Sequence, residues 1–302
     1  MTHAVWQDLL LLPCAAFVAF CLHFVTWRLL RWLTYDFGWQ VLAREPRAWQ
    51  RLRPLRTWLR LRLPRLNASL AARLKPTRFT GLPLSLLVAG ALYLAALLGG
   101  LTEDVIEAGA VLRSDQAVNG FFEPWRGGPL IPVFLWITAL GAGPALTAVA
   151  TVATGFLWAG RRPVYILPLW AAFLGAQATT WSGKYLVGRH RPDFIKAVSE
   201  VSPSFPSGHA TASLALYGFL AYALVRDEPY CRERFEVAFW TAALIAVIGF
   251  SRVFLSLHYT TDVLAGFMVG AFWLLVGFAL AEWGRLHRAA PLVPGAKTVG
   301  NC

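Results

Sequence analysis

Residues 127–160 read GGPLIPVFLWITALGAGPALTAVATVATGFLWAG, a run of 34 positions without a charged side chain. A membrane-spanning helix needs about 20 largely apolar residues. The run is therefore too long for one perpendicular helix. A tilted span, or one kinked at Pro144, with an interfacial lead-in fits its length better. This stretch predicts that the chain is an integral membrane protein.

Six further segments are apolar over most of a membrane thickness, which gives about seven predicted spans. Composition agrees, because 57% of the 302 residues are hydrophobic and only 15% are charged. Soluble domains carry about 25% charged residues. We therefore predict an all-α integral membrane protein. The six further segments cover residues 9–27, 82–101, 163–183, 208–225, 237–251 and 263–281.

The net charge of +12 lies almost entirely in one segment between the first two predicted spans. Residues 28–78 hold 13 Lys and Arg and two acids, a balance of +11. Short loops rich in Lys and Arg stay in the cytoplasm, so this segment is predicted to be cytoplasmic. It either fixes the topology or recognises anionic lipid. Because the charge is confined to this segment, it does not indicate a nucleic-acid-binding protein.

Three connections then fall on the opposite face, the periplasm or exterior, if the chain crosses the membrane at each span. Two of them, residues 102–126 and 252–262, are compatible with the rule that positive loops stay inside. The third, residues 184–207, is basic on the side where the rule predicts few cations. Its cations are Lys184, Arg189, Arg191 and Lys196. This departure from the rule indicates a functional site on that face.

Three polar stretches interrupt the hydrophobic pattern on this face. They read KYLVGRHRP at 184–192, PSGH at 206–209 and SRVFLSLHYTTD at 251–262. Lys184, Arg191 and Arg252 are cations that, in an apolar protein, must face an anion, a carboxylate or water. Any one of them alone is equally explained by snorkelling to the interface. Together they suit phosphate, since arginine forks match its oxygens and Lys adds a point charge.

Two smaller patterns add candidate reactive groups. Ser207 is a candidate N-cap, and Gly208 leaves the backbone N–H groups of a helix start open to an anion. His258 and Asp262 stand four residues apart, so on a helix they share one face. A carboxylate bonded to one imidazole nitrogen leaves the other free as a nucleophile or base. Each pattern taken alone is equally compatible with a structural cap or a structural helix-face pair.

Taken together, the three stretches resemble the signature motifs of the type-2 phosphatidic acid phosphatase (PAP2) family. That family pattern is Lys-x6-Arg-Pro, then Pro-Ser-Gly-His, then Ser-Arg-x5-His-x3-Asp, and every defining position matches in order. The resemblance implies a six-helix transmembrane phosphatase core at 82–283. Residues 1–81 would add an N-terminal transmembrane helix and the basic juxtamembrane segment. Residues 284–302 would form a cytoplasmic tail.

The resemblance also implies residue roles and a reaction. By similarity, His258 is the nucleophile that forms a phosphohistidine, and Asp262 orients it. His209 protonates the leaving group and then activates water. The phosphoryl oxygens would be held by Lys184, Arg191, Ser207, Gly208 and Arg252. No cofactor and no metal is expected.

The expected function is that of a lipid phosphatase in a bacterial inner membrane, acting on a phosphomonoester or pyrophosphate at the periplasmic face. Family substrates include undecaprenyl pyrophosphate, phosphatidylglycerol phosphate, phosphatidic acid and lipid A phosphate. A lipid phosphotransferase using the same residues is an alternative. A non-catalytic anion-binding transporter or membrane scaffold is an alternative of another class. An anion binder has no need of a His258–Asp262 pair opposed by His209, which argues against it.

Overall fold

The computed structural model describes residues 18–31, 61–64, 68, 72–73, 79–127, 130–192 and 201–288. About half of the first predicted span lies outside these residues, as does most of the basic segment 28–78 and of the tail. The chain divides into two compact units, of which the larger contains Leu87–Ala296. The predicted boundaries after residues 81 and 283 stay predictions. All predicted site residues lie in the larger unit.

The described residues contain helices and no strand, as the all-α prediction requires. In the smaller unit, residues 18–31 are helical. From Leu82 onward the elements are α6 (Leu82–Glu107), α7 (Ala110–Phe122), η2 (Glu123–Gly127), α8 (Leu130–Ala139), α9 (Gly143–Ala159), η3 (Pro163–Tyr165), α10 (Ile166–Val187), α11 (Gly208–Val225), α12 (Cys231–Phe254) and α13 (Thr260–Arg288).

Four described helices are long and apolar enough to cross a membrane, namely α6, α11, α12 and α13. The pair α8 and α9, bent by 45°, brings the number to five if it forms one span. Helix α10 has 22 residues, but it contains polar side chains such as Gln177 and Lys184 and is not counted among these candidate spans. The count of seven spans therefore stays a prediction.

The long apolar run is broken near Pro144, which agrees with the kinked alternative and leaves a single span over this run as a prediction. Helix α8 ends at Ala139, and α9 restarts at Gly143 with Pro144 in its first turn. Proline is tolerated there because the first N–H groups of a helix have no partner within the helix. The break at residues 140–142 places Gly141 and Gly143 beside the polar end of α10, where they line a cavity described below.

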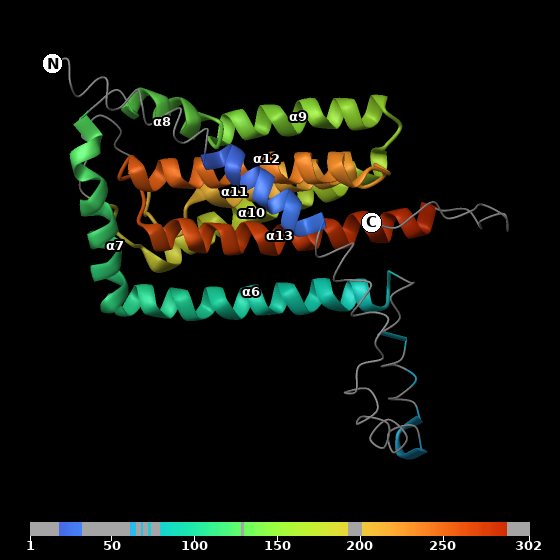
Figure 1. Ribbon diagram of the computed structural model, residues 1–302. Coiled ribbons are helices and arrows are strands. Elements are labelled where there is room, and N and C mark those ends of the chain that lie inside the picture. Colours follow the sequence, from blue (N-terminus) through green and yellow to red (C-terminus); the bar gives the residue numbers. More distant parts are fainter. Residues whose placement is uncertain are drawn as a thin grey trace. The chain divides into compact units, whose positions relative to one another are not determined.

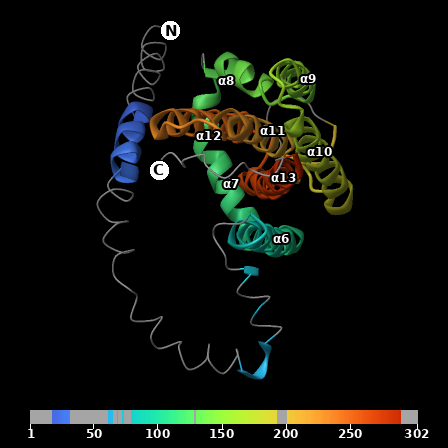
Figure 2. The same ribbon diagram turned by 90° about the vertical axis from the view of Figure 1, so that its right-hand side faces the viewer.

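Helix α11 is the most enclosed helix of the larger unit and packs against α10, α12 and α13 (Figures 1 and 2). Small residues allow this close packing in a membrane protein. A Cβ at Gly266 of α13 would lie 2.7 Å from the carbonyl oxygen of Ser207. A Cβ at Gly270 would lie equally close to that of Thr211. The starts of α11 and α13 are therefore held together, and both carry predicted site residues.

Helix α7 was not predicted, because residues 102–126 were interpreted as an exterior loop. The structure forms α7 and η2 there, and α7 crosses the end of the bundle against α12 and α13 (Figure 1). The segment is too polar to span a membrane, but its apolar side chains Val118 and Phe122 pack against Val253 and Val263. This packing stabilises a helix that lacks the apolar length of a membrane span.

Candidate active site

The three polar stretches meet at the end of the bundle that α7 crosses. Helix α10 ends at Val187 and is capped by Gly188, whose φ of 63° is the left-handed conformation that glycine adopts readily. Ser204, which precedes α11, joins the segment that leads into α11 to the segment that follows α10. Its N–H donates to the carbonyl of Arg189 (2.8 Å) and its hydroxyl donates to that of His190 (3.1 Å).

Two predicted cations bind the segment that precedes α11, at Ser202 and Pro203. The ammonium of Lys184 donates to the hydroxyl of Ser202 (3.2 Å) and to the carbonyl of Pro203. Arg191 Nε donates to the carbonyl of Ser202 (2.8 Å), and Arg191 Nη2 reaches the hydroxyl of Ser202 (3.2 Å). The loop oxygens thus hold two positive charges side by side, although Lys184 is buried. This arrangement suits a ligand with several anionic oxygens.

His258 lies in the turn between α12 and α13 and is buried. Its N–H and that of Leu257 both donate to the carbonyl of Arg252 (3.2 and 3.0 Å). Arg191 Nη1 lies 3.1 Å from His258 Nε2. Because a guanidinium can only donate, Nε2 must be the accepting nitrogen and carries the lone pair. The ring proton is thereby assigned to Nδ1, which faces Asp262 Oδ2 at 3.4 Å.

Asp262 stands in the first turn of α13 and has no exposed surface. Its Oδ2 accepts the N–H of Tyr259 (2.9 Å), and its Oδ1 pairs with Arg189 Nη1 (2.6 Å). Its carbonyl accepts the N–H of Ser207 (2.9 Å), which joins the start of α11 to the start of α13. Each oxygen of the Asp262 carboxylate therefore has a partner that fixes its position next to His258.

A cavity of about 260 Å³ opens beside these groups. Four predicted residues line it: Lys184, Gly208, His209 and His258. His209, in the first turn of α11, and His258, in the turn before α13, thus border the same space. The volume lies slightly below the usual range for ligand pockets. It suits a phosphate group better than a whole lipid.

The start of α11 also borders the cavity. A Cβ at Gly208 would meet only an ordinary contact with Thr180 at 3.5 Å, so packing does not require glycine there. Glycine instead leaves the first N–H groups of the helix uncovered, where an anion can bind. Ser207 holds the N-cap position, but its hydroxyl makes no capping hydrogen bond. That hydroxyl is buried and has no hydrogen-bond partner among the described residues.

The other predicted residues are not among those that line the cavity, namely Arg191, Ser207, Arg252 and Asp262. Arg191 reaches the site through His258 Nε2, and Asp262 through Nδ1. Arg252 is buried in the last turn of α12, where its Nη1 donates to the hydroxyl of Thr138 in α8 (3.1 Å). The structure therefore does not place Arg252 among the residues that line the cavity.

The sequence did not predict two charged residues next to the site, the half-buried Arg189 and the buried Asp115. Arg189 was noted only as a loop cation, yet its guanidinium pairs with both Asp262 and Asp115 of α7. Burial disfavours the charged arginine, but the two carboxylates outweigh it and raise the pKa of Arg189. Asp115 lies 74 residues earlier, on a helix that was not predicted, so no local pattern could have revealed the pair.

A third missed residue, Arg126 of η2, holds the end of α12. Its Nε donates to the carbonyl of Phe254 (2.6 Å), and its Nη2 to that of Val253 (3.1 Å). Burial lowers the pKa of Arg126, and the nearby Glu123 opposes that shift. Arg126 thus satisfies carbonyls that the end of a helix leaves without partners.

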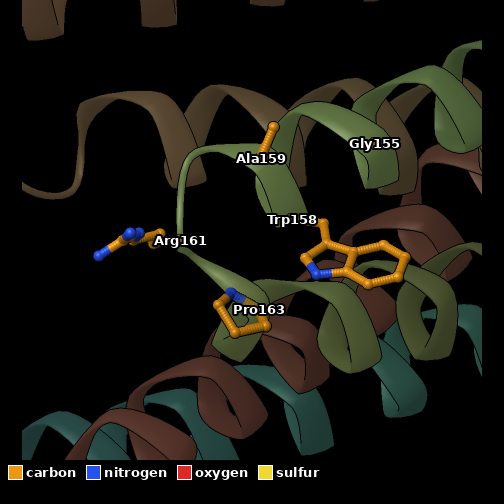
Figure 3. A pocket seen from close by; sticks show the side chains of 5 residues that line it. All are labelled: Gly155, Trp158, Ala159, Arg161 and Pro163. Carbon is orange, nitrogen blue, oxygen red and sulfur yellow. The ribbon is translucent and has the colours of Figure 1, made fainter.

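A larger hollow, of about 730 Å³, lies at the other end of α9. It is lined by Gly155, Trp158, Ala159, Arg161 and Pro163, and Figure 3 shows the guanidinium of Arg161 pointing away from the indole of Trp158. It holds none of the predicted residues and no nucleophile. A helical rise of 1.5 Å per residue puts about 24 Å between its Ala159 and the cavity residue Gly143.

Comparison with known proteins places the chain among membrane phosphatases. A family model described as the PAP2 superfamily matches residues 136–285. The chain is 33% identical over 180 residues to phosphatidylglycerophosphatase B of Bacillus subtilis (strain 168), covering 57% of this chain and 87% of that relative. It is 36% identical over 119 residues to a lipid A 1-phosphatase of Rhizobium johnstonii, covering 36% of this chain and 45% of that relative.

Among solved structures, the fold is similar to that of a transmembrane PAP2-type phosphatidylglycerolphosphate phosphatase from Bacillus subtilis. The TM-score is 0.58 and the sequence identity 28%. The similarity covers 64% of this chain and 96% of that one.

Proposed function

The chain belongs to the PAP2 superfamily and is a membrane lipid phosphate phosphatase, and on this premise we propose that His258 is its nucleophile. One observation carries the proposal. His258 Nε2 accepts from Arg191 while Nδ1 faces Asp262. The nitrogen that carries the lone pair thus belongs to a residue that lines the cavity together with Lys184 and His209. The proposed product of the first step is a phosphohistidine.

In the first step, the phosphoryl group occupies the cavity and its oxygens accept from Lys184, Arg191 and the first N–H groups of α11. Arg191 Nη1 moves from His258 Nε2 to a phosphoryl oxygen, which frees the lone pair. Nε2 then bonds to phosphorus as the P–O bond to the lipid breaks, and His209 gives its proton to the leaving oxygen. Phosphoryl transfer depends mainly on such positioning and charge stabilisation.

In the second step, His209 takes a proton from water, and the resulting hydroxide attacks phosphorus. The P–N bond breaks, inorganic phosphate leaves and His258 regains its lone pair. A lipid hydroxyl in place of water would give phosphoryl transfer to a second lipid, so the same residues also serve the phosphotransferase alternative.

Ser207, Gly208 and Arg252 complete the proposed phosphate site. Gly208 exposes the helix N-terminus, and the buried hydroxyl of Ser207 supplies a donor next to it. Arg252 would exchange the hydroxyl of Thr138 for a phosphoryl oxygen, or act through its charge alone. Each of these three is assigned a binding role, separate from the bond-making roles of the histidines.

A panel of lipid phosphates tests the function. The relatives' names nominate phosphatidylglycerol phosphate and lipid A phosphate, and phosphatidic acid and undecaprenyl pyrophosphate complete the set. With purified protein in detergent, we expect phosphate release from at least one lipid, well above that from a soluble aryl phosphate. Phosphorylated lipid products are measured in parallel, since they would identify a phosphotransferase. Binding without turnover of any lipid would instead favour the anion-binding alternative.

We also propose that the site faces the periplasm of a bacterial inner membrane. The opposite end of the bundle is rich in arginine, which supports a cytoplasmic location for that end. The residues there are Arg161, Arg162, Arg226, Arg232, Arg234, Arg285 and Arg288. A reporter that fluoresces only in the cytoplasm, fused after Glu200, is expected to stay dark. Fluorescence from that fusion would contradict the orientation.

A further inference from the structure

We propose that Arg189 and Asp115 are positioning residues that keep the Asp262 carboxylate charged and aimed at His258. The inference rests on the proposed function, in which His258 is the nucleophile. Neither residue belongs to the three motif patterns, and neither lines the cavity. Their contribution would pass through Asp262 to the nucleophile.

Asp262 is a buried carboxylate that needs compensation. Its side chain is fully enclosed, and a buried carboxylate is costly unless a charge and hydrogen bonds compensate it. Arg189 Nη1 supplies that charge at 2.6 Å from Oδ1. The remaining oxygen, Oδ2, accepts the N–H of Tyr259 and faces His258 Nδ1. Arg189 therefore occupies the oxygen that does not face the histidine.

The guanidinium of Arg189 is itself held in place. Its Nη2 pairs with Asp115 Oδ2 at 2.9 Å, and its Nη1 also donates to the hydroxyl of Thr261 (2.8 Å). The ring of Tyr259 lies 4.3 Å from its Cζ, a cation–π contact. A planar fork bound on both sides has little freedom to rotate away from Asp262.

Asp115 connects this arrangement to α7. In addition to its pair with Arg189, the Asp115 carboxylate accepts hydrogen bonds from the N–H (3.1 Å) and from the hydroxyl of Thr261. Asp115 therefore holds the residue that precedes Asp262. Two carboxylates share one guanidinium, which leaves a net negative charge behind His258. When Nε2 bonds to phosphorus the imidazole becomes cationic, and this charge stabilises it. The contribution arises in the reaction step, so it affects kcat more than KM.

A double-mutant cycle between Arg189 and Asp262 tests the inference. Arg189→Gln alone is expected to lower kcat about 10- to 100-fold with little change in KM, as for loss of a hydrogen bond to a charged group. Arg189→Lys keeps the positive charge but loses the planar guanidinium that bonds both carboxylates, so its kcat should lie between those of Arg189→Gln and the wild type. With Asp262→Asn already present, Arg189→Gln should lower kcat less than about threefold, because the charge it supports is gone.

Arg126→Gln is the matched control, since Arg126 is a second arginine near this turn but bonds the carbonyls of α12. Its effect on kcat should multiply with that of Asp262→Asn, as expected of a purely structural residue. Thermal unfolding of every variant identifies losses due to misfolding, and Arg189→Lys keeps the test open if Arg189→Gln fails to fold.

Two results would overturn the inference. Multiplicative effects of Arg189→Gln and Asp262→Asn on kcat would show that Arg189 acts only on the fold. A rise in KM at unchanged kcat would show that Arg189 acts on substrate binding instead. Both results come from an active wild-type protein. A wild type inert toward every lipid of the panel would instead refute the proposed function, and the inference with it.

Discussion

Replacing His258 with alanine is expected to lower kcat/KM for a lipid phosphate by about 10⁴-fold or more, the scale seen when a nucleophile is removed. The substitution removes the nitrogen that bonds phosphorus while leaving Lys184 and Arg191 in place. Phosphate binding should therefore survive, and inorganic phosphate release should fall to near background. Phosphate release from the lipid that turns over fastest is the measurement, with thermal unfolding to verify the fold.

His190→Ala is the control for this variant. His190 lies in the connection between α10 and α11, as Arg191 does, but its side chain is exposed. The hydrogen bond from Ser204 goes to the backbone carbonyl of His190, which the substitution keeps. Its loss should change the rate less than about twofold, in line with ordinary surface substitutions. Unchanged phosphate release by His258→Ala would remove His258 from the chemistry and favour a different nucleophile.

Replacing His209 with alanine is expected to lower kcat by about 10²- to 10⁴-fold, the usual contribution of a general acid. The loss should be smaller for a pyrophosphate than for a phosphomonoester, because phosphate leaves more readily than an alkoxide. Phosphate release from both kinds of lipid, measured under saturating conditions, gives the comparison. An equal loss on both substrates would show that His209 does not protonate the leaving group.

The same variant should change the pH dependence of kcat/KM. In the wild type, His258 must be neutral to attack, so activity falls as the pH is lowered. His209 must be protonated to donate, so activity falls as the pH is raised. The profile is expected to be bell-shaped between about pH 5 and 8, where histidines titrate. His209→Ala should lose the fall on the alkaline side and keep that on the acid side.

Local patterns predicted the helices that carry the site and the residues that meet there. Predicted span 208–225 coincides with α11, and Pro144 marks the start of α9 after the break. These features follow from helix length, apolar runs and proline chemistry, which a sequence shows directly. The cavity likewise brings together Lys184, His209 and His258, which are far apart in the sequence.

What the sequence did not predict depends on contacts between distant segments. Helix α7 is held by packing across the end of the bundle, and Arg189 pairs with Asp115 over 74 positions. Neither leaves a periodic or spaced signal. Arg252 carries the residue type expected of a phosphate ligand, yet its guanidinium donates to Thr138. Residue type and spacing therefore predicted which residues lie close together more completely than they predicted the partner of each side chain.

The proposed mechanism passes phosphate through a covalent bond to His258, and this intermediate can be trapped. Purified protein is mixed briefly with a lipid phosphate labelled at phosphorus and quenched in alkali, where a phosphohistidine is stable, and the labelled peptide is identified. We expect label that is released by acid, lies on His258, is absent from His258→Ala and accumulates in His209→Ala with a pyrophosphate substrate. Label on another residue, or turnover by wild type without any labelled protein, would contradict the account.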